Sequence, residues 1–263
     1  MIAYSSGNHA LAVATAARVL GIEAVVVMPS DAPAPKMDGA HRAGAELVLY
    51  DRSCDDRESI CLRLSASRGL TLIRPYDDGI VIAGQGTVAL EALEQAAAAG
   101  VRVESMFVPC SGGGLAAGCA IISSAMAPWT RVVTVEPEGF DDTARSLATG
   151  RTQRNISLEG SICDALLVPT PGKLTLPVLR RQKVQGSSVS DAAVFAAMAF
   201  ALRTLKLALE PAGAICLAAV MNEVARERGD AVIAILSGGN VSDTMLIEAL
   251  GASRVQCEPT CLT

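Results

Sequence analysis

Three successive glycines stand where a strand-like stretch gives way to a helix-like one. Gly112, Gly113 and Gly114 lie between Ser111 and Leu115, directly after the apolar residues 106–109. Because glycine has no Cβ atom, the backbone N–H groups of such a turn can close on a phosphate, and the start of the following helix adds a partial positive charge. The turn therefore predicts a phosphate-binding loop.

Two other interpretations of this turn stay open. A flexible connection needs no ligand, although three glycines in one turn are conformationally costly unless something fills the space beside them. The spacing of Gly112, Gly114 and Gly118 loosely matches a dinucleotide site. That match is weak, because no acidic residue is well placed for a ribose after the next strand and no P-loop lysine follows.

Two further turns combine hydroxyl, amide and glycine residues. Residues 5–9, Ser-Ser-Gly-Asn-His, lead directly into a helical pattern, and such a helix start suits a carboxylate or a phenolate-like oxygen. For His9 taken alone, a structural role is favoured over a catalytic one. Residues 237–240, Ser-Gly-Gly-Asn, follow an apolar run and taken singly would be only a strand-to-helix connection.

The three turns belong to an alternation of apolar runs of strand length with Ala-rich segments of helical period. This pattern is typical of βαβ units around a mainly parallel sheet, in which ligands bind at the carboxyl ends of the strands. We expect strands at residues 24–28, 47–50, 71–74, 106–109, 132–135 and 231–236. We expect helices at residues 9–20, 35–43, 55–67, 80–99, 115–126, 191–207 and 212–228. Residues 151–183, with several Pro, Gly, Ser and Thr, predict loops with short elements over a site or an interface.

The composition supports an α/β protein and excludes several functions. Hydrophobic residues make up 51% of the 263 residues and charged residues 19%, which argues against disorder. A net charge of -5, with Lys and Arg scattered, gives no basic surface for nucleic acid. No apolar run is long enough to cross a bilayer and no signal peptide is visible, so we expect a cytoplasmic protein without a membrane partner. The eight cysteines form no CxxC pair and are expected to be reduced.

Six short motifs occur in one order along the chain. They are SSGNHA (5–10), AGQGT (83–87), SGGGL (111–115), VEPEGFDD (135–142), EPAGA (210–214) and SGGN (237–240). Together they resemble the fold-type II pyridoxal phosphate (PLP) enzymes, and more narrowly the threonine/serine dehydratase and serine racemase group. The resemblance implies two α/β domains with mainly parallel sheets flanked by helices, the tryptophan synthase beta-like PLP fold. Residues 1–77 would form the small domain, and residues 78–263 the remainder of a large domain whose first part is missing.

The resemblance also implies which residues bind the cofactor. The residues that would take its phosphate are Ser111, Gly112, Gly113, Gly114 and Leu115. Asn8 would hydrogen-bond the phenolic oxygen, Glu210 would lie near the ring edge, and Ser237 would face the pyridine nitrogen. A neutral hydroxyl, unlike a carboxylate, does not hold that nitrogen protonated, so the ring would be a weaker electron sink. That property suits β-elimination more than transamination.

A second set of residues would bind the substrate, again by resemblance. Ser5, Ser6 and the amides near His9 would hold its carboxylate, while Gln85 and Gly86 would lie near the rest of the molecule. Ser6 also matches the serine that acts as the acid/base on the second face in the racemases, and it is the catalytic residue we expect in this chain.

The motif at residues 135–142 matches the divalent-cation site of several family members. Glu136, the Phe140 carbonyl and Asp142 would be the ligands, and hard oxygen donors of this kind suit Mg²⁺ or Ca²⁺. The alternative is an acidic first turn of the helix after Gly139, which needs no metal. The sequence does not choose between them.

One expected residue is absent. Family members carry the Schiff-base lysine, which binds PLP and removes the Cα proton, upstream of the motif that begins at Ser5. The four lysines of this chain lie in segments that match other parts of the family; they are Lys36, Lys173, Lys183 and Lys206. We therefore expect that Met1 is a misplaced start or another truncation, that the chain as it stands is inactive, and that apolar surface is left exposed.

The sequence thus predicts a PLP-dependent ammonia-lyase that converts L-threonine or L-serine to a 2-keto acid and ammonia. A serine or amino-acid racemase of the same family is the nearest alternative. A non-catalytic PLP-binding or regulatory subunit is an alternative of another class, favoured by the missing lysine. The family implies a homodimer for the full-length protein. Because only one helix and a short tail are predicted after residue 240, we expect no C-terminal regulatory domain.

Overall fold

The computed structural model describes residues 1–5, 7–32, 34–51, 53–223 and 231–255. The chain divides into two compact units, Met1–Val81 and Ile82–Thr263, each with its own parallel sheet. The expectation of an α/β fold with parallel sheets and flanking helices is confirmed. The assignment of residues 1–77 and 78–263 to a small domain and part of a large one stays a prediction.

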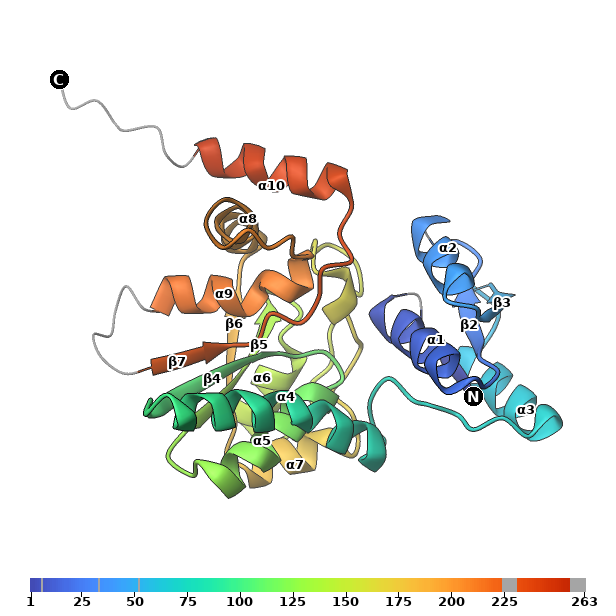
Figure 1. The fold of residues 1–263 in the computed structure, drawn as a ribbon, viewed down its shortest axis with the longest axis horizontal. Coiled ribbons are helices and arrows are strands. Elements are labelled where there is room, and N and C mark those ends of the chain that lie inside the picture. Colours follow the sequence, from blue (N-terminus) through green and yellow to red (C-terminus); the bar gives the residue numbers. More distant parts are fainter. Residues whose placement is uncertain (6, 33, 52, 224–230, 256–263) are drawn as a thin grey trace. The chain divides into compact units, whose positions relative to one another are not determined.

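The first unit is built on a three-stranded parallel sheet in the order β1-β2-β3. Its strands are β1 (Ile2–Tyr4), β2 (Val25–Pro29) and β3 (Glu46–Tyr50). Its helices are α1 (Asn8–Leu20), α2 (Ala34–Arg42) and α3 (Arg57–Arg68). Helices α1 and α2 pack on one face of the sheet, and α3 packs on the other (Figure 1).

The central strand β2 explains why this sheet needs helices on both faces. Successive side chains of a strand point to opposite sides. Val26 and Met28 join the apolar cluster under α1 and α2, while Val25 and Val27 join the cluster under α3. All four are buried, so β2 is an uninterrupted apolar run, as is usual for a parallel strand covered on both faces.

The second unit is built on a four-stranded parallel sheet in the order β6-β5-β4-β7. Its strands are β4 (Val103–Pro109), β5 (Arg131–Pro137), β6 (Gln185–Val189) and β7 (Ala231–Ala234). Its helices are α4 (Gly79–Ala98), α5 (Gly114–Met126), α6 (Asp142–Thr149), α7 (Thr175–Arg181), α8 (Asp191–Phe200), α9 (Pro211–Glu223) and α10 (Asp243–Val255). A 3₁₀ turn, Asp164–Leu166, lies in the long connection between α6 and α7.

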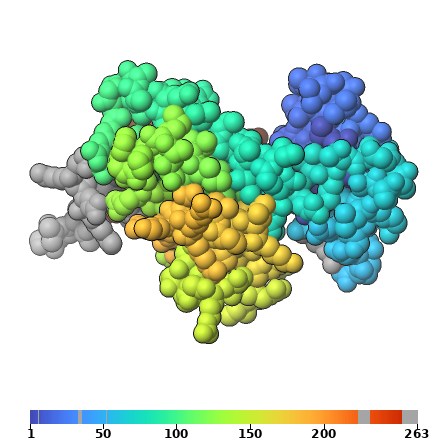
Figure 2. Space-filling view, turned by 90° about the horizontal axis from the view of Figure 1, so that it is seen from below, coloured from blue at the N-terminus to red at the C-terminus, as the bar shows by residue number. Residues whose placement is uncertain are grey.

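Helices cover this sheet on both faces as well. On one face α9 packs on the strands, and α8 lies between α9 and α10 (Figure 1). On the other face α5 packs on β4 and β5, with α7 beside it, and the two helices adjoin at the surface (Figure 2). Phe107 and Val133 belong to the cluster under α9, whereas Met106 and Val132 belong to the cluster under α5. The alternation along each strand therefore divides the core into two layers.

Some expected elements differ from the structure. Residues 71–74 form no strand and contribute only a bridge between Leu72 and Ile2. The pairing is short because β1 itself is short, and Pro75 has no N–H to extend it. The sequence prediction also missed β1 and β6.

Two expected helices also end differently. The helix expected at 191–207 ends as an α-helix at Phe200 and continues as a π-helical turn over Ala201–Leu205, which closes at Lys206 in a left-handed conformation (φ 62°). The helix expected at 212–228 is described as far as Glu223, and its remaining residues lie outside the described part of the chain.

None of the helices in the described ranges combines the length and the apolar character needed to cross a membrane.

Candidate functional site

The predicted phosphate loop lies at the carboxyl end of β4, one of the two inner strands of the second unit's sheet. β4 ends at Pro109, and α5 begins at Gly114. Gly112, Gly113 and Gly114 are all buried. Gly113 has a left-handed backbone (φ 88°), and its carbonyl accepts the hydrogen bond from Ala117 N that starts the helix, at 2.8 Å. The first N–H groups of α5 have no partner inside the helix, so they are available to an anion at this turn.

The turn at 237–240 follows the neighbouring strand. β7 pairs with β4 in parallel, and Ile235 N donates to Phe107 O at 3.0 Å. Because carboxyl ends of parallel strands meet at one edge of a sheet, Ser237 and the phosphate loop follow adjacent strands at the same edge. The structure thus brings these two predicted segments of the second unit to one region.

The motif that contains Glu210 packs directly against the 237–240 turn. Glu210 N donates to Gly238 O at 3.1 Å, and Glu210 is buried. A Cβ atom added at Gly213 would lie 2.9 Å from Gly238 N and still closer to Gly238 O. Backbone meets backbone here, which explains why this position is a glycine.

Gln85 and Gly86 lie on α4, where the structure gives the glycine a packing role. A Cβ atom added at Gly86 would lie 3.1 Å from Gly118 O on α5, and one added at Gly118 would lie 2.6 Å from Gly86 N. The two helices therefore cross at a pair of glycines that allows close approach. Gln85 is partly buried one residue away, and its contact with a substrate stays a prediction.

The predicted carboxylate-binding turn lies in the first unit, between β1 and α1. Ser5 N donates to Val27 O at 3.2 Å, and the Ser5 hydroxyl accepts from Gly7 N at 3.1 Å. Asn8 opens α1 and is exposed. Ser6, the predicted catalytic residue, lies outside the described residues.

His9 is tied to the backbone of the first unit. Its Nε2 lies 3.0 Å from Ile73 O, and the side chain is partly buried. Burial lowers the pKa of His9, against the effect of this hydrogen bond, which favours the charged ring. The contact gives the imidazole a structural role and leaves the backbone amides at the helix start as the groups suited to an anion.

The predicted cation ligands form a buried acidic pair where β5 leads into α6. Glu136 accepts hydrogen bonds from Thr143 N at 3.0 Å and Ala144 N at 2.7 Å, so its carboxylate caps the helix start. Asp142 Oδ1 accepts from Asn155 Nδ2 at 2.6 Å. Burial and the charge of Asp142 raise the pKa of Glu136 to about 8, and burial raises that of Asp142 to about 6.

One atom of this pair fits a cation. Asp142 Oδ2 is buried and has no hydrogen-bond partner, which is costly for a carboxylate oxygen. The described residues hold no group of three or more His, Cys, Asp or Glu side chains around one point. A cation here would therefore need the Phe140 carbonyl or water as well, which is the oxygen-rich coordination that Mg²⁺ and Ca²⁺ accept.

Comparison with known proteins decides the family. Residues 1–238 match the family model described as pyridoxal-phosphate dependent enzyme. The chain belongs to this family. An L-threo-3-hydroxyaspartate ammonia-lyase from Pseudomonas sp is 39% identical to it over 241 residues, which are 92% of this chain and 74% of that protein.

Solved structures of PLP-dependent relatives share the fold. A threonine deaminase from T.th. superposes with a TM-score of 0.85 and 42% identity, over 92% of this chain and 77% of that one. A maize serine racemase superposes with a TM-score of 0.86 and 36% identity, over 97% and 78%. The homologues of this PLP-dependent chain thus include ammonia-lyases and serine racemases.

The second unit fits the cofactor that the family uses. A phosphate needs N–H donors without side chains in the way, and the buried glycines at the end of β4 supply such backbone. A pyridine nitrogen needs one polar partner, and Ser237 is exposed at the same edge of the sheet. The individual roles of these residues stay predictions.

Two residues that the sequence analysis did not single out hydrogen-bond predicted site residues of this PLP-dependent chain. Thr175 donates a hydrogen bond to Gly112 O at 2.6 Å, and Asn155 holds Asp142. Both lie in the segment expected to contain loops over a site. The turn signal at Pro171 and Gly172 marks the approach to α7, but nothing in the sequence relates it to the glycine loop.

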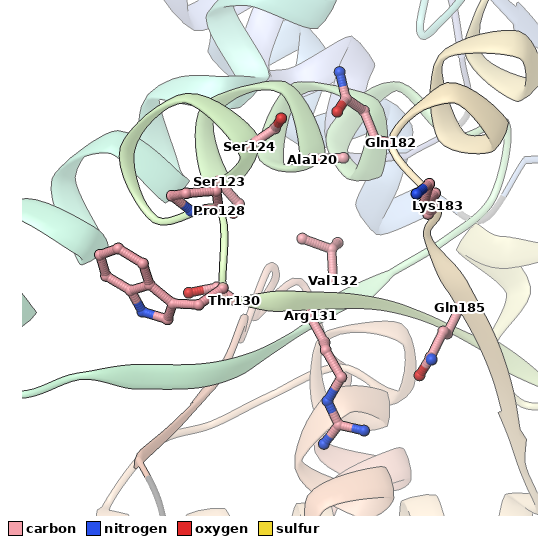
Figure 3. A pocket seen from close by; sticks show the side chains of 11 residues that line it. Ala120, Ser123, Ser124, Pro128, Thr130, Arg131, Val132, Gln182, Lys183 and Gln185 are labelled. Atoms are coloured by element: carbon pink, nitrogen blue, oxygen red, sulfur yellow. The ribbon is translucent and has the colours of Figure 1, made fainter.

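A separate hollow of about 210 Å³ lies at the opposite end of the strands (Figure 3). Ser123 and Ser124 come from the end of α5, Val132 from the start of β5, and Gln182 and Lys183 from the turn after α7. No predicted site residue lines it. Because α5 and α7 both end here, their carbonyl groups favour the nearby basic side chain without requiring a ligand.

Proposed function

We propose that this chain provides the cofactor- and substrate-binding residues of an ammonia-lyase that acts on L-threonine or L-serine. The observation that carries the proposal is the buried glycine loop at the carboxyl end of β4, beside the Ser237 turn at the end of β7. It is supported by relatives named L-threo-3-hydroxyaspartate ammonia-lyase and threonine deaminase.

In the second unit, the backbone N–H groups of Gly112, Gly113 and Gly114 bind the phosphate, with Ser111 and Leu115 at the ends of the loop. When bound, PLP supplies the electron sink that stabilises negative charge at the substrate Cα. The Ser237 hydroxyl would hydrogen-bond the pyridine nitrogen without protonating it, an environment that suits β-elimination more than transamination.

Further residues bind and orient the ligands. In the first unit, Asn8 hydrogen-bonds the phenolic oxygen, while Ser5, Ser6 and the amides at the start of α1 hold the substrate carboxylate. In the second unit, Gln85 and Gly86 lie near the substrate, and Glu210 lies near the ring edge.

No lysine of this chain is assigned as the base. Lys206 Nζ donates to Arg203 O at 2.6 Å, and Lys183 lines the hollow at the far end of the strands. Removal of the Cα proton needs a base, and these placements give no support for Lys206 or Lys183 in that role.

Product analysis tests the activity. The chain is incubated with PLP and L-threonine or L-serine, and 2-keto acid, ammonia and D-serine are measured. Keto acid with ammonia supports the lyase, and D-serine without keto acid supports a racemase, the candidate favoured by the likeness to the maize enzyme. Absence of both products is the outcome expected of a chain without an assigned base. Borohydride reduction after PLP titration then separates covalent attachment from the loose binding expected of a non-catalytic subunit.

We also propose a divalent-cation site, Mg²⁺ or Ca²⁺, at Glu136, the Phe140 carbonyl and Asp142, supported by the unpartnered Asp142 Oδ2. A cytoplasmic location is supported by the described cysteines, which are all free thiols, as is usual in a reducing compartment. We also propose a homodimer, and sedimentation of the purified protein tests it.

A further inference from the structure

The carbonyl of the peptide group between Gly112 and Gly113 accepts two hydrogen bonds from the region of α7. Thr175, the first residue of α7, is fully buried, and its hydroxyl donates to Gly112 O at 2.6 Å. Gly172 N donates to the same oxygen at 3.2 Å. The carbonyl that an anion would repel therefore has two donors, one from the first residue of α7 and one from the turn before it.

This bond also sets the direction of the neighbouring N–H. A peptide group is planar and trans, so its C=O and N–H point in opposite directions. With Gly112 O turned toward Thr175, Gly113 N–H must point away from α7. Anion-binding loops work by this separation, in which N–H groups converge on the ligand while carbonyl oxygens are withdrawn.

Thr175 also occupies the space beside Gly113. A Cβ atom added at Gly113 would lie 2.9 Å from Thr175 Oγ1 and 3.1 Å from Thr175 Cβ. Gly113 has a φ of 88°, a region that residues with a Cβ rarely adopt. One buried side chain thus orients the loop and leaves no free space for a Cβ atom at its centre.

We propose that Thr175 is a positioning residue for phosphate binding. It does not touch the phosphate; it holds the Gly112–Gly113 peptide so that the Gly113 N–H faces the ligand. The inference rests on the proposed function of the glycine loop, and it adds a residue to which no role was assigned.

Three variants of the full chain test this role. Thr175→Ala removes the hydroxyl without adding volume, Thr175→Val replaces it with a methyl group, and Thr175→Ser keeps it as the matched control. Gly112 O keeps the bond from Gly172 N in each variant, so its carbonyl is not left without a donor. Thermal melting of each variant reports on folding independently of ligand.

Affinity is measured for PLP and for pyridoxal, which lacks the phosphate, with inorganic phosphate as competitor. We expect Thr175→Ala and Thr175→Val to weaken PLP binding roughly tenfold, the change produced by loss of one well-made buried hydrogen bond. Pyridoxal binding should stay within about twofold for all three variants, and Thr175→Ser should match the wild type, because only the phosphate contact is affected. A merely structural defect would weaken both ligands equally.

The outcomes separate this inference from the proposed function. If the wild type binds PLP no better than pyridoxal, the glycine loop does not bind phosphate and the proposed function fails. If the wild type prefers PLP and Thr175→Ala keeps that preference, the loop works without Thr175 and the inference is wrong. Because the alanine variant adds no atoms, it remains informative if the valine variant does not fold.

Discussion

Replacing Gly113 by alanine tests how tightly the phosphate loop is built. Two costs add at this position. A residue with a Cβ in the left-handed region costs roughly 1–2 kcal/mol relative to glycine. The new Cβ would also lie 2.9 Å from the Thr175 hydroxyl, which is buried and already hydrogen-bonded to Gly112 O. Overpacking of a well-packed site adds roughly 1–3 kcal/mol, so the free energy of unfolding should fall by roughly 2–5 kcal/mol.

Gly150→Ala is the matched control. Gly150 also has a left-handed backbone (φ 69°) and ends α6, but a Cβ added there meets no atom within 4 Å. This variant should lose only the backbone cost of roughly 1–2 kcal/mol. Urea unfolding followed by circular dichroism measures both changes. If Gly113→Ala is no more destabilising than Gly150→Ala, Thr175 can move aside at little cost, and the claim that it packs tightly against Gly113 is refuted.

Three further predictions concern packing and charge. Gly118→Ala should destabilise the protein by about 1–3 kcal/mol, because its Cβ would collide with the backbone of α4. Gly251→Ala is the control, because a Cβ there meets no atom within 4 Å and should not destabilise the protein. Equal melting temperatures of the two variants would contradict the close crossing of α4 and α5. The pKa of Glu136 rises from 4.5 to about 8, so the folded state holds this proton more tightly than the unfolded chain. The free energy of unfolding should therefore fall as pH rises between about 4.5 and 8. Urea titrations at several pH values measure this dependence, and Glu136→Gln should reduce the slope of the free energy against pH. An unchanged slope would show that another group causes the dependence. At pH 8, Mg²⁺ or Ca²⁺ should raise the Tm of the wild type and not that of Asp142→Asn, while an equal response of the two would place the cation elsewhere.

The sequence determined the local features of this protein. Strands such as β4 and helices such as α5 could be predicted because apolar runs and helical periods are properties of neighbouring residues. The glycine loop could be predicted for the same reason. Gly112, Gly113 and Gly114 are adjacent in the sequence, and three residues without a Cβ atom indicate a backbone that a phosphate can approach closely. The order of six short motifs pointed to the PLP-dependent family, and the family match confirms it.

Pairing partners and edge positions were harder to predict. β6 contains Gly186, Ser187 and Ser188 and has no apolar run, because it lies at the edge of its sheet and only its pairing with β5 makes it a strand. A Cβ at Gly186 would collide with Ala144 on α6, so its glycine is explained by a helix 42 positions earlier in the chain. The π-helical turn after Phe200 likewise leaves no periodic signal in the sequence.

Only the tertiary structure showed which residues hold the predicted site residues in place. Thr175 reaches Gly112 across 63 positions of sequence, and Asn155 reaches back to Asp142 at the start of α6 from the segment that follows this helix. No spacing rule links such residues, because their contact depends on how strands, helices and loops pack after the chain has folded. The residues that touch a ligand are therefore visible in the sequence through their chemistry, whereas those that hold them in place become visible only through packing.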